Sequence, residues 1–391
     1  MSAFILWSGV FAVSKPQPKR RVTFRVLHNF TGGSDGCCIL GGLARDFHGS
    51  LYGVAYSDNG LTGDGDLFKL VPAGRGYTFH ILLYFSAAKG RECMTTPTID
   101  KSGNLFGVCF GGGVADKGTL WEYSRLGKFT VLHNFSGPAD GMSPQDSVAV
   151  DKSGHLYGTA YTWGLGQSGT FWKYSLHSGT FTLLHNFADG DDGALLPAGP
   201  KIDETGVVWG TTEFGPNCYY CGNGTVWNYD PSSGKFATVL NLDSTNILAP
   251  QSRVVVGEKG NVYGTAFDTS QGNCGVVYEL LKDNSYAPIV IHEFTADGGD
   301  GCGPFGRVRF DEPGNLLGTT YDGGDFGRGA VYELKHGKDG WHETILHSFN
   351  LSDGWRPQSG LITDRKGNWF GTTAMGGKHT WGTVFEISGV P

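Results

Sequence analysis

The sequence predicts an all-β fold, a seven-bladed β-propeller with four antiparallel strands in each blade. Three observations predict it. Glycine makes up 64 of the 391 residues, more than twice its usual share of about 7%, and so many glycines disfavour a helical protein. A short phrase, Asn-Leu-Tyr-Gly-Thr or a close variant, recurs seven times along the chain. The two ends of the chain carry complementary parts of a single unit.

The repeat has an almost constant period, which indicates a repeat architecture. Its bulky residue recurs at intervals of 54, 51, 52, 54, 54 and 53 residues and is always followed by glycine. These positions are Tyr52, Phe106, Tyr157, Trp209, Tyr263, Leu317 and Phe370. The glycine falls in the middle of a predicted strand, where we expect a neighbouring backbone or ring to approach closely.

Each unit predicts four short strands, and the third unit illustrates the pattern. An apolar strand at 147–151 leads into an Asp-x-x-Gly turn, because Asp favours the first turn position and Gly the left-handed last one. The next three strands carry Tyr157-Gly-Thr, Gly169-Thr-Phe-Trp and Leu184-His-Asn-Phe. Alternating apolar and polar residues between glycine-rich turns are typical of antiparallel strands.

The chain ends favour a closed ring over an open solenoid. The segment 22–30 matches a fourth strand without its first three, and the segment 382–387 matches a third strand without a fourth. Paired, the two complete the last blade and hide edges that an open row of sheets would expose. Solenoid repeats are usually shorter and need capping units.

Several phrases carry a family resemblance. The stretch from Leu132 to Trp172 contains Leu-His-Asn-Phe-Ser-Gly, an Asp-Gly pair at Asp140, Asp-Lys-Ser-Gly-His-Leu-Tyr-Gly and Gly-Thr-Phe-Trp. These phrases resemble the GloVer tandem repeat of bacterial extracellular proteins, over about residues 22 to 388. The resemblance implies a secreted or surface-displayed propeller. It implies no reaction, because the repeated pattern is structural and a fold alone fixes no activity.

Net charge indicates which binding partners to expect, and the hydropathy of the N-terminal segment indicates the cellular location. A net charge of −7 and a pI near 5.9 predict no nucleic-acid partner and no anionic lipid surface. The apolar run 3–13 has the length of a signal-peptide core and is too short to span a bilayer. We expect residues 1–21 to be an N-terminal segment resembling a truncated signal peptide, residues 22–391 to form one propeller domain, and no membrane span elsewhere.

Eight cysteines support an extracellular or cell-surface location. Seven fall in connections that open on one face of a propeller, which predicts disulfides that brace long loops in an oxidising compartment. We expect Cys218 to pair with Cys221, and Cys274 with Cys302. The spacing of Cys218 and Cys221 also suits zinc, but no second pair or adjacent histidine completes a site.

The recurrent histidines and aspartates are interpreted as structural. Five histidines occupy the repeated Leu-His-x-Phe position, and five loop aspartates precede glycine in a turn. They are His28, His133, His185, His292 and His347, with Asp35, Asp140, Asp192, Asp300 and Asp353. No metal site or cofactor is therefore predicted, although the oxygen-rich turns 189–193 and 297–301 keep calcium open as an alternative.

Residues outside the repeat pattern on the loop face are the predicted ligand contacts. Aromatic side chains beside planar polar groups suit stacking on sugar rings or anchoring a protein partner. The candidates are Trp163, Tyr219, Tyr220, Trp355, Arg356, His379 and Trp381, together with the carboxylates Glu92 and Glu213. Packing of these aromatics over the channel mouth is an equally good interpretation.

Two functions follow. The favoured one is a secreted or surface module that binds a glycan or protein partner through its disulfide-braced loop face. The alternative is a secreted lyase, lactonase or glycan-cleaving enzyme that uses loop carboxylates, with or without calcium. Only Asp146 and Gln251 stand as polar ligands where first strands enter the channel, too few for a hard-cation cage. The oligomeric state is not predicted.

Overall fold

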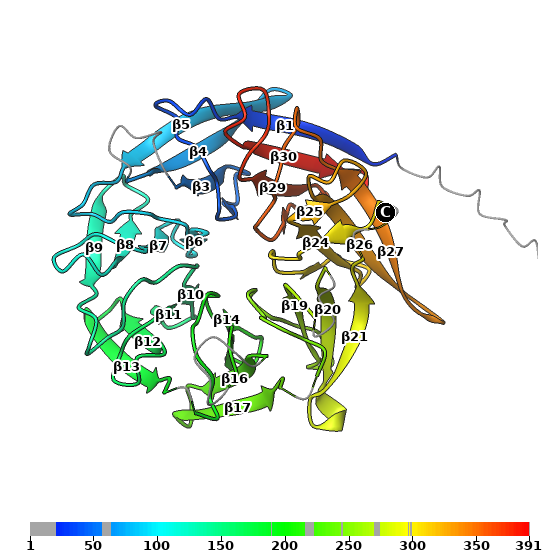
Figure 1. Cartoon of the computed structure of the whole chain (residues 1–391). Helices are drawn as coiled ribbons and strands as arrows, with labels where there is room; N and C mark the ends of the chain where they lie inside the picture. Colours follow the sequence, from blue (N-terminus) through cyan, green and yellow to red (C-terminus); the bar gives the residue numbers. More distant parts are fainter. Residues whose placement is uncertain are drawn as a thin grey trace, which may run out of the picture.

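The computed structural model is a ring of seven four-stranded antiparallel sheets arranged around a central axis (Figure 1). It describes residues 21–390 except 57–63, 189, 216–222, 244, 270–273, 296 and 298. The predicted seven-bladed propeller is confirmed. The expected N-terminal segment, residues 1–21, lies outside the described residues apart from Arg21.

The first three blades follow the chain in order from the channel outward. Blade 1 comprises β2 (Ala44–Arg45), β3 (Leu51–Ala55), β4 (Asp66–Ala73) and β5 (Gly76–Tyr84). Blade 2 comprises β6 (Thr98–Ile99), β7 (Leu105–Cys109), β8 (Thr119–Tyr123) and β9 (Phe129–Asn134). Blade 3 comprises β10 (Ala149–Val150), β11 (His155–Ala160), β12 (Thr170–Ser175) and β13 (Thr180–Asn186).

The next three blades repeat this arrangement. Blade 4 comprises β14 (Lys201–Ile202), β15 (Val208–Thr212), β16 (Thr225–Asp230) and β17 (Lys235–Asn241). Blade 5 comprises β18 (Val255–Val256), β19 (Val262–Ala266), β20 (Val276–Leu281) and β21 (Ala287–Glu293). Blade 6 comprises β23 (Arg309–Phe310), β24 (Leu316–Thr320), β26 (Ala330–Gly337) and β27 (Gly340–Ser348).

The two ends of the chain close the ring in blade 7. Strands β28 (Ile362–Thr363), β29 (Trp369–Thr373) and β30 (Thr383–Ser388) are completed by β1 (Thr23–Asn29). Strand β1 runs antiparallel to β30, with Phe24 opposite Ile387, and Figure 1 shows this first strand in blue beside the last one in red. The predicted closure is thereby confirmed, and it leaves the ring without a free first or last blade.

The repeated glycine explains how the blades pack so tightly. In every blade it lies opposite an aromatic residue of the third strand, and a Cβ added at Gly158 would lie 2.3 Å from the Trp172 ring. The same close approach, at 2.1 to 2.4 Å, recurs at Gly53, Gly107, Gly210, Gly264, Gly318 and Gly371. These glycines let large buried rings lie flat on the neighbouring strand, as expected from a glycine inside a strand.

The apolar core is divided into seven clusters, each lying between two adjacent blades. The cluster that closes the ring joins Phe30, Leu51 and Phe68 with Phe370 and Val384. Polar turns lie on the face opposite the loop face. In the predicted Asp-x-x-Gly turn, Asp100 accepts backbone hydrogen bonds from Ser102 (2.8 Å) and Asn104 (2.9 Å). The innermost strands are only two residues long. Their residues line the central channel.

Two smaller features complete the fold. The ribbon of β22 (Gly301–Cys302) and β25 (Asp322–Gly323) and the single-turn 3₁₀ segment η1 (Lys282–Asn284) lie outside the blades. Among the described residues, no helix has the length and apolar character needed to cross a membrane.

Within the described residues, two disulfides brace the loop face. Cys274 pairs with Cys302, as the sequence indicated, and Cys93 pairs with Cys109, which sequence reasoning did not identify. Cys37 and Cys38 are both thiols, and Cys38 donates a hydrogen bond to the Cys37 sulfur at 2.9 Å. The expected Cys218–Cys221 pair lies outside the described residues.

Candidate functional site: the mouth of the central channel

The central channel contains two cavities that share lining residues. The outer one, about 300 Å³, is formed mainly by residues that precede the innermost strands, with Tyr161 and Glu213 from the segments after β11 and β15. The inner one, about 630 Å³, is lined by the innermost strands themselves. Both are lined by Thr96, Arg253 and Arg307. The mouth and the channel below it therefore adjoin at these three side chains.

Hydrogen-bonding groups converge at one side of the mouth. Glu213 accepts a hydrogen bond from the Gln251 amide (2.7 Å) and one from the Tyr161 hydroxyl (3.1 Å). Burial raises the pKa of the Glu213 carboxyl above its usual value, while these two bonds act in the opposite direction. Asp146 accepts hydrogen bonds from the Gly199 backbone and the Ser147 hydroxyl, both at 3.0 Å. Polar, hydrogen-bonded groups in this geometry can orient a bound sugar or amide.

An arc of aromatic rings leads away from the mouth. Phe305 lines the mouth, and its ring centroid lies 4.6 Å from that of Phe267 and 5.3 Å from that of Tyr321. The Arg356 guanidinium covers the Tyr321 ring at 4.7 Å and the Trp355 ring at 4.6 Å. Two predicted contacts, Trp355 and Arg356, are thus joined to the mouth through Tyr321 and Phe305.

The channel below the mouth is strongly basic. The inner cavity is lined by Arg45, Lys201, Arg253, Arg307 and Arg309, and its described lining includes no carboxylate. Arg253 is 9% exposed, and its guanidinium donates hydrogen bonds to the Ser147 hydroxyl (2.6 Å) and the Pro200 carbonyl. Its Nε has no hydrogen-bond partner in the structure. This concentration of positive charge stands out in a chain whose net charge is −7.

The basic side chains depress one another's pKa values. Burial, followed by repulsion from Arg253, Arg307 and Arg309, lowers the pKa of Lys201 to about 8. Burial is the main cause at Arg309 as well, where it lowers the pKa to about 10 with a further contribution from Arg307. Like charges held this close favour any bound anion, because an anion offsets both the repulsion and the lost hydration.

The remaining predicted contacts lie apart from the mouth. Trp163 is 44% exposed in its own loop, with the Lys117 ammonium 5.5 Å from its ring. Trp381 packs over Gly32, where an added Cβ would lie 2.6 Å from the indole, so this side chain has a structural position. His379 and Glu92 are exposed.

Two predicted contacts, Tyr219 and Tyr220, lie outside the described residues. Of the nine predicted contacts, the structure therefore brings Glu213 to the mouth itself and connects Trp355 and Arg356 to it through rings. It does not bring the seven described contacts together into one cluster.

Sequence reasoning missed the basic lining. Gln251 and Phe305 mark the positions where two first strands enter the channel, and Arg253 and Arg307 each follow two residues later. Both entry positions were available from the repeat, so the basic residues that closely follow them were candidates for the channel lining.

The recurrent histidines have structural partners, as expected. In four of the five positions the imidazole pairs with the loop aspartate at 2.7 to 3.2 Å. His133, for example, contacts Asp140 at 2.9 Å and stacks on Phe181 of the next blade at 3.9 Å. His292 is the exception, since its Nε2 lies 3.7 Å from Asp300.

The repeat now identifies the family. The sequence profile of the Gloeobacter/Verrucomicrobia repeat matches residues 48–268 and 249–390. The chain belongs to this family. The GloVer resemblance inferred from the repeated phrases is confirmed by the match. Among curated proteins, no match to the chain was found.

Solved structures share the fold at low sequence identity. The extracellular domain of a provisionally assigned one-component system from B. thetaiotaomicron is 13% identical with a TM-score of 0.59, over 92% of this chain and 39% of that one. A provisionally assigned 6-phosphogluconolactonase from Bacteroides fragilis is 11% identical with a TM-score of 0.52, over 82% and 86%. PorZ, a surface component of the type-IX secretion system of Porphyromonas gingivalis, is 16% identical with a TM-score of 0.49, over 88% and 46%.

The first two of these structures, with TM-scores above 0.5, support the propeller fold, and the first of them is an extracellular domain. At such low sequence identity, the similarity shows a shared fold and nothing about function. The chain spans well under two thirds of the first of these structures, so the activity of that larger protein does not transfer to it.

Proposed function

We propose that this protein is an extracellular binding module that recognises a glycan carrying acid groups at the mouth of its central channel. The observation that carries the proposal is the basic channel lining, which includes Lys201, Arg253 and Arg307, in a chain of net charge −7. Favourable interaction with an anion is concentrated at this one place on the ring axis.

The chemistry above the basic lining suits a sugar. Glu213 and Gln251 are planar groups that can form paired hydrogen bonds with vicinal hydroxyls, and Phe305 and Tyr321 offer ring faces for stacking. A ligand that combines hydroxyls, an apolar ring face and a carboxylate or sulfate would use all three parts of the site. A uronate-containing polysaccharide has this combination.

An extracellular location accords with the disulfides Cys93–Cys109 and Cys274–Cys302. Disulfides persist in oxidising compartments and are rare in the cytosol. Both lie on the loop face, where they brace segments that support the mouth. The location is part of the proposal.

One observation favours the enzymatic alternative as a second candidate. Glu213 and Asp146 are two carboxylates in the same mouth, and burial raises the pKa of Glu213. A carboxyl with a raised pKa is suited to act as a general acid in glycan cleavage or lactone opening. Turnover that is abolished by Glu213→Gln would establish this alternative.

Calorimetric titration of the full chain with polygalacturonate oligomers and with neutral dextran oligomers tests the binding proposal. We expect binding of the acidic glycan alone, weakened at least about tenfold by Arg307→Gln and by raising the salt concentration. Arg365→Gln is the matched control, since Arg365 is an exposed arginine in the turn after β28. Equal affinity for both glycans, or binding to neither, contradicts the proposal. Capture of a protein partner through the same arginines would show that the ligand is a protein and not a glycan.

The pH profile of this titration provides a second test. Burial and the neighbouring guanidinium groups lower the pKa of Lys201 to about 8, so most of its positive charge is lost when the pH rises from 7 to 9. We expect affinity for the acidic glycan to fall over this interval, and Lys201→Gln to abolish the dependence. Assay of the same samples for new reducing ends or unsaturated products separates binding from turnover.

A further inference from the structure

Five junctions between blades contain the same histidine, and four of them are built alike. In these four, the imidazole pairs with a loop aspartate at 2.7 to 3.2 Å and stacks on a phenylalanine of the next blade, with ring centroids 3.7 to 4.1 Å apart. The phenylalanines are Phe79, Phe181, Phe236 and Phe24. The pair of histidine and aspartate is thus covered by an aromatic ring.

The fifth junction, between blades 5 and 6, replaces that ring with a carboxylate. Phe181 lies opposite Tyr174 in its blade, and Glu343 lies opposite Leu334 at the equivalent position of blade 6. The other three phenylalanines occupy the same register. Glu343 therefore stands where every other histidine of this type has phenylalanine.

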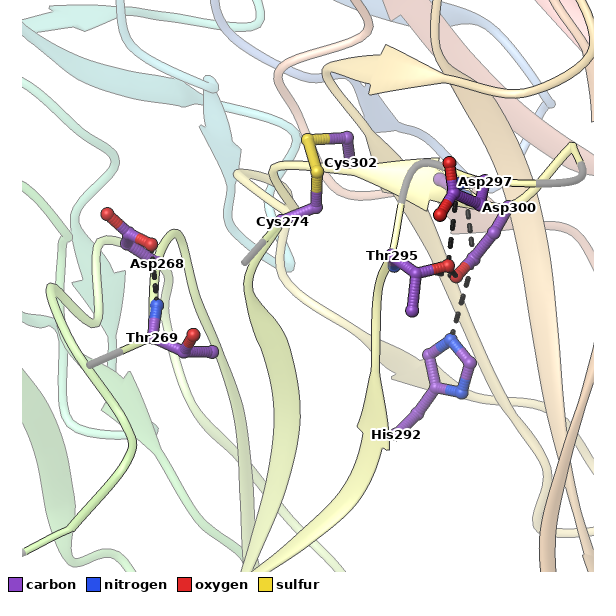
Figure 2. Close-up of a disulfide and its surroundings, with 9 residues drawn as sticks. Asp268, Thr269, Cys274, His292, Thr295, Asp297, Asp300 and Cys302 are labelled. Carbon is purple, nitrogen blue, oxygen red and sulfur yellow. Dashed lines mark hydrogen bonds and ion pairs between the residues drawn. A yellow bond between two sulfur atoms is a disulfide. The ribbon is translucent and has the colours of Figure 1, made fainter. Parts of the chain in front are cut away.

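The geometry of His292 changes with this replacement. Its Nε2 lies 3.5 Å from Glu343 Oε1 and 3.7 Å from Asp300 Oδ1, longer than the pairing distance in any of the other four junctions. Neither His292 Nε2 nor Glu343 Oε1 has a hydrogen-bond partner in the structure. Figure 2 shows the His292 ring directed at Asp300, close to the Cys274–Cys302 disulfide.

The three side chains surround a common point. One ligand atom from each of His292, Asp300 and Glu343 lies within 4.8 Å of the other two, and the described part of the chain contains no other group of three metal-binding side chains this close. Asp300 is held in place by the backbone amide (2.8 Å) and the hydroxyl (3.1 Å) of Thr295, which both donate to its Oδ2. Such supporting bonds orient a metal ligand.

We propose that His292, Asp300 and Glu343 form a binding site for a divalent transition-metal ion of the Zn²⁺ class, which links blades 5 and 6. One imidazole and two carboxylates supply three ligands that suit Zn²⁺, and a water molecule would complete four-coordination. Ligand atoms on such an ion lie about 3.4 Å apart for bonds of about 2.1 Å. The observed separations need only small side-chain movements to reach that geometry.

The electrostatics of the cluster agree with a bound cation. Two carboxylates share one partly buried place, and burial raises the pKa of the Glu343 carboxyl to about 7, with a further contribution from Asp300. A cation among the three ligands would offset this cost. The site has access to solvent, because Asp300 and Glu343 line an open cavity of about 650 Å³ together with Asp297 and Asp325.

The site is independent of the proposed glycan site. His292 lies on β21 and Glu343 on β27, the outermost strands of their blades, whereas the mouth is formed at the innermost strands. We therefore infer a structural role for the ion. It would hold two blades together at the one histidine junction that lacks the aromatic stack.

Calorimetric titration of the untagged, metal-stripped full chain with Zn²⁺ tests the proposal. We expect one ion to bind and, at a hundredfold excess over Kd, to raise Tm by about 3 °C. Cysteines elsewhere in the chain could also bind zinc, so the titration is repeated with Co²⁺, whose spectrum reports the ligand type. Binding at the proposed site should give a Co²⁺ spectrum without a thiolate charge-transfer band. No binding of Zn²⁺ up to millimolar concentration would overturn the proposal, as would a Co²⁺ spectrum dominated by thiolate.

The deciding variant is Glu343→Phe, which restores the residue found at the other four junctions and should therefore fold. We expect it to weaken Zn²⁺ binding at least tenfold, and Glu343→Gln to do the same. His347→Gln is the matched control, since His347 occupies the equivalent position in the next blade and pairs with Asp353. Equal Zn²⁺ affinity in wild type and Glu343→Phe would overturn the proposal. Glycan binding by Glu343→Phe is measured in parallel. Because the metal site is separate from the mouth, this measurement distinguishes a failure of the metal proposal from a failure of the proposed glycan binding.

Discussion

Two junctions of the ring show how a repeat reveals its own exceptions. Between blades 2 and 3, His133 bonds to Asp140 at 2.9 Å under the ring of Phe181. Between blades 5 and 6, the equivalent imidazole contacts two carboxylates at 3.5 and 3.7 Å and has no ring above it. Because the backbone register is the same in both, the difference isolates one side chain. A departure from the repeat is informative since the other junctions define the structural baseline.

The largest expected effect comes from removing the aspartate at each junction. Asp140 is 8% exposed and accepts from His133, from the Ser136 backbone and hydroxyl, and from the Gly137 backbone, at 2.8 to 3.0 Å. Asp140→Ala should lower the free energy of unfolding by about 3 kcal/mol, because several donors lose their acceptor. In the metal-stripped protein, Asp300→Ala should lower the free energy of unfolding by about half as much. Equal losses in denaturant titrations would show that the two junctions do not differ.

Acid should weaken the regular junction through the same carboxylate. Burial acts to raise the pKa of Asp140, but the hydrogen bonds from His133 and Ser136 outweigh it and hold the pKa below its ordinary value. A carboxyl with a depressed pKa contributes stability above its unfolded pKa of about 3.8, and this stability is lost as the pH falls further. We expect wild-type stability to drop below about pH 4, and less steeply in Asp140→Asn. A parallel decline in both proteins would contradict the assignment.

The framework common to both junctions should respond equally to overpacking. An added Cβ at Gly158 would lie 2.3 Å from Trp172, and one at Gly318 would lie 2.3 Å from Tyr332. Gly158→Ala and Gly318→Ala should each cost about 2 kcal/mol, the range found for extra methyl groups in a packed core. Gly206→Ala, at a turn where an added Cβ meets nothing within 4 Å, serves as a reference for the effect of a positive φ. A much smaller loss at either strand glycine would mean that the ring can move aside.

The smallest effect concerns the aromatic stack itself. Without metal, Glu343→Phe should raise the free energy of unfolding by about 1 kcal/mol, because it removes a buried carboxylate and lets a ring stack on His292. With Zn²⁺ the order should reverse, since wild type gains the bound ion. Thermal unfolding of both proteins with and without the ion gives this crossover directly. Parallel shifts in the two proteins would remove the contrast between the junctions.

The sequence predicted the ring and its closure because both depend on the period of the chain. The spacing of Tyr52 to Phe370 and the unmatched segments at 22–30 and 382–387 determined blade number and closure, and the mid-strand glycines anticipated the ring contacts. Such features are local in sequence or strictly repeated. The structural roles of the recurrent histidines followed from the same repetition.

The site was harder to predict because it depends on contacts between distant segments. Glu343 reads as an ordinary carboxylate in an outer strand until the register places it over His292. The channel arginines come from blades 1, 5 and 6, and only the closed ring brings them together. Trp381, which the sequence offered as a ligand contact or as packing, lies over Gly32, and the sequence alone gave no sign of this neighbour.

The pairing of β1 with β30 has a consequence for how the protein is made. Residue 23 leaves the ribosome long before its partner at residue 388 exists, and at about 5–20 residues per second the interval is roughly 20–70 s. During that time the nascent chain carries an unpaired β-edge that invites wrong partners. Chaperones that hold the nascent chain unfolded until its last strand is synthesised should therefore improve the yield of native protein.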